Sequence, residues 1–366
     1  IKMSILQKKI INLFPTSFGL DLSDLSVKAV WLERNGNHEA IASYGSVPIP
    51  PGAIADGEII DGEIVKSAIK TLLEKAGPKK ISTKKVICSL PETKAFLRII
   101  TLPQMKADEV KEAIKWEIEA NIPLTLDQVY YDWQVLDLNL ANEKDKMSVL
   151  VVAVSRTNVD QFQEVLEGAG LEPLGLETES IAEARSLLLE NDDKRTTLIV
   201  DIGDRRSSFL VAIGNSPCFT SSVPLSSQMM TDAISKSLQI SFDQAETMKI
   251  KHGLGSLAEK SPAFLACEPI LESIAIEIEK SLDFFLTNFP VVEKIDHIVF
   301  CGGGSNMQGV LPYMAKRLGR PVEAGNPWVN LRLGKRLPLI DRDHSVQYST
   351  AIGLALRGLD EYEDFT

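Results

Sequence analysis

The sequence predicts an α/β fold with two similar lobes. Two stretches of the chain, residues 17–32 and 197–213, share one arrangement: an apolar strand that ends in aspartate, a polar turn, and a second apolar strand. Apolar and polar residues that alternate on both sides of a tight turn are typical of a β-hairpin. A third stretch, residues 296–307, has a buried-type strand followed by three glycines and the approach to a helix. That order is typical of ligand-binding loops in α/β proteins.

The first hairpin carries the residue types of a phosphate site. Asp21 ends its first strand, Ser23 and Ser26 lie in the turn, and Lys28 begins the second strand. Hydroxyls and backbone amides at a turn can enclose a phosphate, and a carboxylate at a strand end can hold hydrated Mg²⁺. An ordinary hairpin with a polar tip has the same pattern, so this stretch alone leaves both interpretations open.

The second hairpin and the glycine loop strengthen the ligand-site interpretation. The second hairpin offers a matching set of residues, Asp201, Gly203, Ser207 and Ser208. Glycines let a backbone approach a flat ligand because no Cβ intervenes, and the loop candidates are Gly302, Gly303, Gly304, Ser305 and Met307. A helix predicted over residues 241–253 places Glu246 and Lys249 on one face, although an exposed charge pair would have the same spacing.

These segments, in this order, resemble the motifs of the superfamily that contains actin, sugar kinases and heat-shock ATPases. The resemblance implies a site for ATP or ADP with Mg²⁺ between the lobes. Asp21 and Asp201 would hold the ion through water, and Lys28 would neutralise phosphate charge. The serines would bind the phosphates, the glycine loop would seat the adenine, and Glu246 with Lys249 would bracket the ribose and adenine.

Within that superfamily the chain resembles the PilM family of type IV pilus assembly, which is related to the division protein FtsA. The likeness is carried by residues 85–91, 98–103 and 113–123, and it extends from about Phe18 to about Gly358. It implies an actin-like (ribonuclease H-like) two-lobed ATPase fold with a β-α-β-β-α subdomain inserted in the first lobe. It also implies a cytoplasmic ATP-binding scaffold of the type IV pilus, or of the related type II secretion system, which binds the N-terminal tail of PilN.

The resemblance divides the chain into segments. An N-terminal arm would span residues 1–17, and an acidic tail residues 359–366. The first lobe would comprise residues 18–91 and 171–195, with 344–358 as a returning connector helix. The inserted subdomain would span residues 92–170, and the second lobe residues 196–343.

The first lobe is expected to begin with strands around 18–23, 27–34 and 38–47, before a proline-rich break. A helix over 64–76 follows from its apolar spacing, and Gly77-Pro78 ends it. A strand is expected over 85–90. The insertion would then have strands at 94–102, 129–137 and 147–155, with helices at 106–120 and 157–169.

The second lobe is expected to continue from its hairpin with a strand at 218–223 and helical structure at 226–237. Helices would follow within 241–290, including a long one over 268–289. A strand over 295–300 would feed the glycine loop, a helix over 310–318 would follow it, and one last helix would span 344–356.

The resemblance places the groove for the PilN tail between the insertion and the first lobe, with walls from residues 92–103 and 129–137. Large aromatic residues gather in the insertion, which fits either core packing or a peptide-binding surface. They are Trp116, Tyr130, Tyr131 and Trp133. Other inner-membrane pilus components would be reached through PilN, and a homodimer or a filament stays open.

The resemblance also implies a glutamate or glutamine that orients an attacking water near residues 174–185. Glu177 is the first choice and Glu179 the second, although an acid that stabilises the start of a helix has the same position. Four residues depart from the family pattern at the phosphate hairpins, namely Ser23, Asp24, Arg205 and Arg206. These departures favour a nucleotide-loaded scaffold that is at most a weak ATPase.

Composition narrows the class of protein. The chain has 366 residues and a net charge of −11, which argues against a nucleic-acid binder. Its four cysteines lie in or beside apolar runs without paired spacing, as expected of free thiols in a reducing compartment. The four histidines form no metal-ligand pattern. With no membrane span or signal peptide in the sequence, we expect a cytosolic protein held at the inner membrane by its partner.

Two other classes of protein share parts of this pattern. A kinase of small metabolites would need a general-base aspartate and a sugar-binding constellation, and the sequence offers neither clearly. A division protein like FtsA usually ends in an amphipathic membrane helix, whereas residues 360–366 are mostly acidic.

The arm has its own pattern, because lysines accompany apolar residues and no acid appears before Asp21. Such an arm can contact an anionic membrane or fray as a tail. Residues 11–15 (Ile-Asn-Leu-Phe-Pro) resemble the Ile-Asn-Leu-Leu-Pro type of motif that PilN presents to PilM. This resemblance suggests that the arm occupies the partner cleft of its own or a neighbouring chain.

Overall fold

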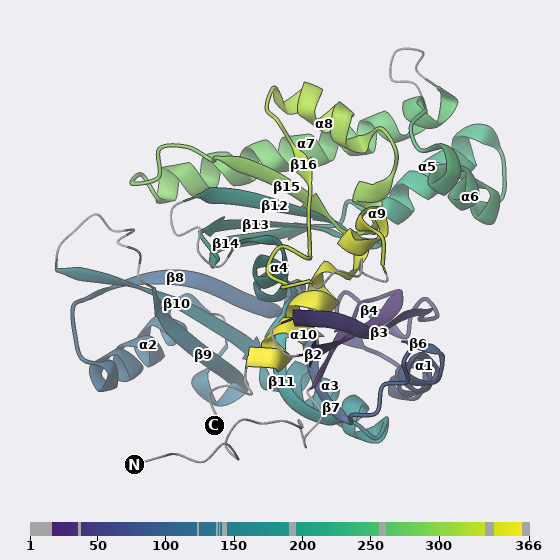
Figure 1. Cartoon of the computed structure of the whole chain (residues 1–366). Helices are drawn as coiled ribbons and strands as arrows, with labels where there is room; N and C mark the ends of the chain where they lie inside the picture. Colours follow the sequence, from purple (N-terminus) through teal and green to yellow (C-terminus); the bar gives the residue numbers. More distant parts are fainter. Residues whose placement is uncertain are drawn as a thin grey trace.

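The structure of the chain is a computed structural model. It describes residues 17–35, 38–122, 124–136, 138, 140, 145–189, 195–255, 261–333 and 340–360. Nearly all of the predicted arm and residues 361–366 of the acidic tail lie outside the described residues. Two lobes and an inserted subdomain are visible in Figure 1, with the second lobe at the top of the view.

The first lobe is built on a six-stranded mixed sheet, in the order β11-β7-β1-β2-β3-β6. Helices α1 (Gly62–Lys75) and α3 (Arg156–Gly168) cover one face, and α4 (Glu179–Leu187) and α10 (Ser349–Asp360) cover the other. A short hairpin, β4 (Ile54–Ala55) and β5 (Glu58–Ile59), precedes α1. The sheet strands are β1 (Phe18–Leu22), β2 (Ser26–Asn35), β3 (His38–Pro48), β6 (Gly77–Pro78), β7 (Lys85–Leu90) and β11 (Glu172–Thr178).

The insertion forms a three-stranded antiparallel sheet in the order β8-β10-β9. Its strands are β8 (Ala95–Pro103), β9 (Val129–Leu136) and β10 (Lys146–Ser155). Short 3₁₀ turns, η2 (Glu92–Lys94) and η3 (Leu126–Gln128), precede β8 and β9. Helix α2 (Ala107–Asn121) covers one face, because Val110, Ile114 and Ile118 form an apolar stripe at helical spacing that packs on β10.

One helix of the expected insertion packs elsewhere. Phe162, Val165 and Leu166 of α3 are buried in the core of the first lobe, where α3 contacts α1 and β11. They recur at i, i+3 and i+4, so they form one apolar face, and that face meets the first lobe. The predicted β-α-β-β-α order is present along the chain, but the final helix belongs to the first-lobe core.

The second lobe has a five-stranded sheet in the order β14-β13-β12-β15-β16. Helices α5 (Ser227–Leu238) and α7 (Pro262–Asn288) pack on one face, and α4 packs on the other. The remaining elements are β12 (Thr196–Ile202), β13 (Ser207–Ile213), β14 (Ser216–Val223), α6 (Phe242–His252), β15 (His297–Cys301), η4 (Gly303–Asn306), α8 (Val310–Leu318) and β16 (Glu323–Ala324).

Two helix boundaries differ from the expectation. The long helix α7 begins at Pro262, six residues before the predicted start, because Ser261 caps it and proline suits the first helical position. The last predicted helix is broken into α9 (Arg342–Ser345), a 3₁₀ turn η5 (Val346–Tyr348), and α10.

Helices α4 and α10 cross at the centre of the molecule, between the two lobes (Figure 1). A Cβ added at Gly353 of α10 would lie 1.8 Å from the carbonyl oxygen of Ala182 in α4. The crossing is therefore possible only with glycine at that position. Because α4 contacts both sheets, its side chains reach the space between the lobes.

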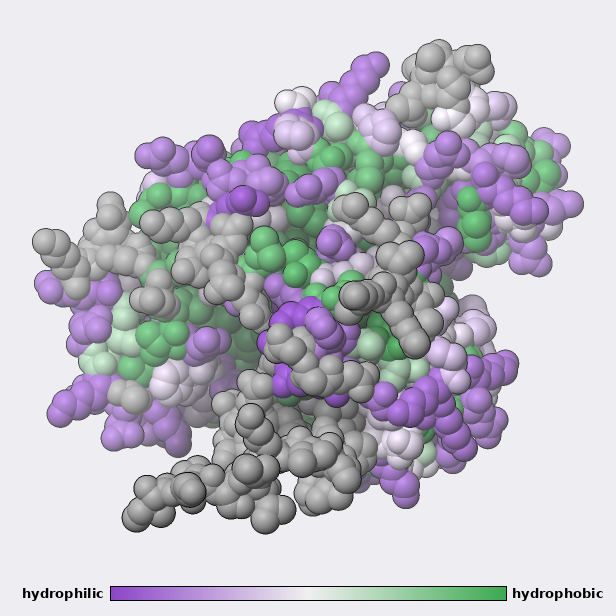
Figure 2. All heavy atoms as spheres, in the orientation of Figure 1, coloured by the Kyte–Doolittle hydropathy of each residue, from purple (hydrophilic) through white to green (hydrophobic). Residues whose placement is uncertain are grey.

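Hydrophilic residues cover most of the outer rims of both lobes, whereas hydrophobic residues reach the surface over the sheet of the insertion, toward the left of Figure 2. Across the part of the chain that the structure describes, no helix combines the length and hydropathy needed to cross a membrane.

Candidate functional site

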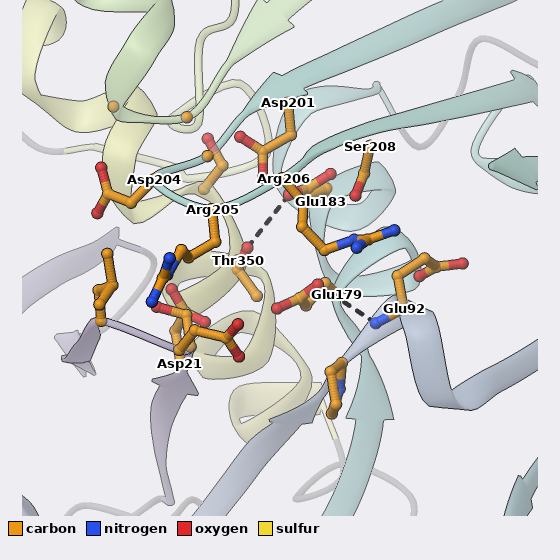
Figure 3. A pocket seen from close by; sticks show the side chains of 18 of the residues that line it. Asp21, Glu92, Glu179, Glu183, Asp201, Asp204, Arg205, Arg206, Ser208 and Thr350 are labelled. Carbon is orange, nitrogen blue, oxygen red and sulfur yellow. Dashed lines mark hydrogen bonds between the residues drawn. The ribbon is translucent and has the colours of Figure 1, made fainter. Parts of the chain in front are cut away.

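A polar cavity lies between the lobes, where both predicted hairpins, the glycine loop, α4 and the start of α10 converge. Asp21 and Asp201 face the cavity from different lobes, and Glu179 and Glu183 lie between them (Figure 3). The sequence-predicted residues that line it are Asp21, Ser23, Lys28, Asp201, Gly203, Ser208, Gly302 and Gly303. The two hairpins therefore meet as their common pattern predicts.

Asp21 is held by an ion pair and by a neighbouring strand. Lys28 lies directly across the hairpin, and its Nζ atom is 3.2 Å from Asp21 Oδ2. Ser89 on β7 donates its hydroxyl to Asp21 Oδ1 at 3.3 Å. Burial opposes the charge on Lys28, but the carboxylates of Asp21 and Asp204 outweigh this effect and raise the pKa of Lys28. The lysine is thus a fixed positive charge in the cavity wall.

The turn of the first hairpin explains the unusual acid at position 24. Asp24 accepts hydrogen bonds from the backbone amides of Asp56 and Gly57, at 3.1 and 3.0 Å. Its carboxylate therefore holds the turn between β4 and β5. Ser23 also differs from the family pattern, and its hydroxyl donates to the carbonyl oxygen of Ser26 at 3.0 Å. Ser26 itself is buried and supports the turn without lining the cavity.

The second hairpin presents serine and arginine side chains differently. Ser208 lines the cavity, whereas Ser207 is fully buried and donates its hydroxyl to the carbonyl oxygen of Leu225 at 2.7 Å. Arg206 donates to the Ser222 hydroxyl at 3.0 Å and lies 3.5 Å from Asp56 across the lobes. This arginine therefore connects the second hairpin with the turn that Asp24 holds.

Several carboxyl groups in the cavity have raised pKa values. Burial raises the pKa of Asp201 to about 6, although Glu183 and Lys28 oppose the rise. Burial, and then the neighbouring charges of Asp21 and Asp201, raise the pKa of Glu179 well above its usual value. Burial and the charge of Asp201 also raise the pKa of Glu183 well above its usual value. The Thr350 hydroxyl donates a hydrogen bond to Glu183 Oε1 at 3.3 Å. Negative charge in this cavity is thus undercompensated.

A hydrated cation fits beside Asp201. Its Oδ1 atom is buried and has no hydrogen-bond partner among the described residues. Such an orphaned carboxylate oxygen is costly unless an ion or a water molecule satisfies it. One ligand atom each from Glu183, Asp201 and Cys301 also lies within 4.8 Å of the others. The donors suit a cation, and oxygen donors such as Asp201 and Asp21 suit Mg²⁺.

The glycine loop is shaped around the same aspartate. Gly302 has φ +78°, and a Cβ there would lie 1.8 Å from Asp201 Oδ1. A Cβ at Gly304 would lie 2.4 Å from Cγ2 of Ile202, whereas one at Gly303 would meet nothing within 4 Å. Ser305 donates its hydroxyl to the Gly302 carbonyl at 2.8 Å, and Met307 is buried in the core of the second lobe. Only Gly302 and Gly303 of this loop line the cavity.

The helical pair Glu246 and Lys249 lies outside the cavity lining, although it is joined to the second hairpin. Lys249 Nζ is 2.8 Å from Glu246 and 2.7 Å from the hydroxyl of Ser227. The backbone amide of Ser227 donates to the carbonyl of Gly203 at 2.9 Å. The pair therefore positions the helix that follows this hairpin, and its predicted contact with ribose and adenine stays a prediction.

The first choice for a water-orienting acid does not fit the cavity. Glu177 is the last residue but one of β11, and both of its carboxylate oxygens lie 2.6 Å from Arg185. It lines a second hollow, on the other side of α4. Glu179, the second choice, lines the inter-lobe cavity and accepts the amide of Glu92 at 3.4 Å. The position at which β11 ends and α4 begins decides which of the two glutamates enters the inter-lobe cavity.

Sequence reasoning missed Glu183, Glu92 and Thr350 as cavity residues. Glu183 lies four residues after Glu179 on α4, so the two acids share a helix face. The sequence signal for Glu183 was an acidic residue between Ala182 and Ala184, on an otherwise apolar part of the predicted helix. No comparable signal marked Glu92, which is buried where the insertion begins.

The second hollow has a volume of about 540 Å³ and lies between the insertion and the first lobe. Its walls come from β9 (residues 130–134), β10, β11 and α4. Residues 130–134 of the predicted wall over 129–137 line this hollow and residues 92–103 do not, because β10 lies between β8 and β9. The walls of the PilN groove stay a prediction.

A family model described as "type IV pilus assembly protein PilM" matches residues 19–359. The chain belongs to this family. Among solved structures, a PilM–PilN type IV pilus biogenesis complex matches with a TM-score of 0.80 and 27% identity, covering 94% of this chain and 98% of that chain. The family predicted from the sequence is therefore confirmed.

Other proteins that are similar to this chain share less of its sequence. FtsA, a cell division protein of Neisseria meningitidis serogroup B, is 25% identical over 276 residues, or 67% of this chain and 65% of that protein. MreB5 of Spiroplasma citri bound to AMPPNP has a TM-score of 0.57 and 12% identity, covering 96% and 98% of the two chains. EutJ from Carboxydothermus hydrogenoformans has a TM-score of 0.56 and 17% identity, covering 96% and 93%. These matches confirm the actin-like fold.

Proposed function

We propose that this protein is an actin-like, ATP-binding scaffold of the type IV pilus inner-membrane assembly complex. Its inter-lobe cavity would take ATP or ADP with Mg²⁺, and its groove would take the N-terminal cytoplasmic tail of PilN. The protein would then lie in the cytoplasm, peripheral to the inner membrane, and reach other pilus components through PilN. Membership of the family supports the pilus role, and the PilM–PilN complex among its structural relatives supports the partner.

The buried Oδ1 atom of Asp201 carries the nucleotide part of the proposal. This atom needs a cation or water, and Asp201 lines a cavity that Asp21 and Lys28 also line. Asp21 and Asp201 would hold Mg²⁺ through water, and the ion would neutralise charge on the phosphates. Lys28 and the hydroxyls of Ser23 and Ser208 would bind phosphate oxygens directly.

Nucleotide binding between lobes favours the arrangement in which both lobes contact it. Because α4 and α10 join the lobes, a ligand that binds both hairpins would stabilise their crossing. Glu179 would stand near the phosphates, in surroundings where burial and the charges of Asp21 and Asp201 raise its pKa.

Calorimetric titration with Mg-ATP tests the nucleotide part. The Asp201→Asn variant should bind Mg-ATP about 10- to 100-fold more weakly, as is usual when a group that orients metal-bound water is lost. Asp232→Asn is the matched control, because Asp232 is an exposed acid on α5 outside the cavity. Equal affinities for the two variants would contradict the proposed site.

A further inference from the structure

Residues of two outer strands, from two different sheets, line the groove. Strand β9 is the outer strand of the insertion sheet, and β11 is the outer strand of the first-lobe sheet. Residues 130–134 of β9 and 176–178 of β11 both line the groove. An edge strand presents backbone amides and carbonyls that can pair with another extended chain. The groove is therefore suited to an extended peptide that adds a strand.

One part of the groove lining is apolar, and another part is charged. Leu150, Val152 and Val154 of β10 line it, on the face of the sheet opposite α2. Leu176 and Ile181 face them from the first lobe. An ion cluster of Glu177, Arg185 and Arg357 also lines the groove. An occupant should accordingly carry apolar side chains at alternate positions.

The first described residue of the chain packs near a residue that lines this groove. Ser17, the first described residue, is buried against the end of α10, and a Cβ at Gly358 would lie 2.2 Å from its Oγ atom. The preceding residue of that helix, Arg357, lines the groove, and its Nη1 atom lies 3.6 Å from Glu177 Oε1. Pro15 is only two residues from Ser17, or about 7 Å of extended chain.

The arm has the composition that the groove requires. Residues 10–14 read Ile-Ile-Asn-Leu-Phe, with β-branched residues that favour an extended strand. Lys2, Lys8 and Lys9 precede or flank this run and no acid accompanies them, although the whole chain carries a net charge of −11. Attraction between a basic arm and an acidic body favours docking in cis.

We propose that residues 10–15 of the chain itself occupy the groove, paired with the free edge of β9 or β11. The arm would then exclude any other peptide that enters the same groove. That it competes with the PilN tail rests on the proposed function, whereas the docking of the arm does not. A tethered segment competes at an effective concentration in the millimolar range. With a segment dissociation constant of about 0.1 mM, the arm would weaken binding of an outside peptide about tenfold.

The test compares two full-length chains. In one, Leu13→Asp and Phe14→Asp together remove the apolar side chains of the arm, and the other is unaltered. The probe is a fluorescein-labelled synthetic peptide with the sequence of residues 8–16, and its binding is followed by fluorescence anisotropy. We expect the altered chain to bind the probe about tenfold more tightly than the unaltered chain, because its own arm no longer competes.

Groove variants locate the binding within the altered chain. Tyr130→Asp, on the groove side of β9, should weaken probe binding at least tenfold. Val135→Asp is the matched control, because Val135 lies on the same strand with 45% exposure against 43% for Tyr130, but does not line the groove. Equal effects of the two changes, or equal probe affinities for both chains, would overturn the proposal.

A second probe separates this inference from the proposed function. A PilN-type peptide of the Ile-Asn-Leu-Leu-Pro kind should also gain affinity when the arm is altered. If it binds both chains equally, the partner groove stands and the arm is excluded. If only the arm peptide binds, the arm proposal stands and the PilN assignment fails. Dimers that form with the unaltered arm and vanish with the altered arm would show docking in trans, which contradicts the proposal.

Discussion

Replacing Gly302 with alanine tests whether the glycine loop and Asp201 form one cation site. The added Cβ would lie 1.8 Å from Asp201 Oδ1, although real Cβ atoms essentially never approach another heavy atom within 3.0 Å. Either the aspartate or the loop must therefore move by more than 1 Å. The backbone at Gly302 has φ +78° and ψ 164°, which costs a residue with a side chain about 1–3 kcal/mol.

Gly302→Ala should therefore lose Mg-ATP binding about 10- to 100-fold, because the displaced Asp201 carboxylate no longer orients the hydrated ion. Gly319→Ala is the matched control, since Gly319 also has a positive φ of +62°, a Cβ there meets nothing within 4 Å, and the residue lies outside the cavity lining. Calorimetric titration with Mg-ATP gives the affinities, and thermal unfolding gives the stability cost. If both variants bind Mg-ATP as the unaltered chain does, the argument from the loop is refuted.

Three further predictions follow from individual side chains. Glu179→Gln should lower the slow rate of ATP turnover, because an amide cannot accept a proton from water, whereas Glu177→Gln should leave the rate unchanged. A phosphate-release assay in which only Glu177→Gln had an effect would contradict this prediction. Burial opposes the charge on Glu39, but hydrogen bonds from Arg332 outweigh it and lower the pKa of Glu39. The lowered pKa means that its stabilisation is present above pH 4.5 and lost as pH falls through the folded-state pKa. Chemical denaturation from pH 6 to 3 should therefore show a shallower loss of stability for Glu39→Gln, by about 1 kcal/mol, and an unchanged slope would refute the role of this contact. All four thiols are buried, namely those of Cys88, Cys218, Cys267 and Cys301, and burial raises their pKa values. A thiol reagent at pH 8 should therefore modify them only after denaturation.

Local patterns along the chain were sufficient to predict the parts of the site that are themselves local. Each phosphate hairpin is defined by an alternation of apolar residues and by an aspartate at the end of a strand. The repeated pattern predicted that Asp21 and Asp201 would meet. The short distance between Gly302 and Asp201 explains why glycine stands there, but only the packed structure supplies that distance.

Features that depend on distant contacts were not predictable from the sequence. Asp24 departs from the family pattern at the first hairpin, and its carboxylate accepts hydrogen bonds from two amides that lie 32 and 33 residues away along the chain. The choice between Glu177 and Glu179 depends on one register at the junction of a strand and a helix. A slip of one position along a strand reverses the direction of a side chain. The packing of α3 against α1 likewise depends on which apolar surface the folded chain offers.

Calorimetric titration of a synthetic PilN-type peptide, with and without Mg-ATP, tests the central claim most directly. The account predicts saturable binding at one site per chain, abolished by scrambling the peptide and by Tyr130→Asp but not by Val135→Asp. Any difference caused by Mg-ATP would measure the coupling free energy between the groove and the cavity. Absence of peptide binding under both conditions, with ATP still bound, would contradict the proposed role as a pilus scaffold for PilN.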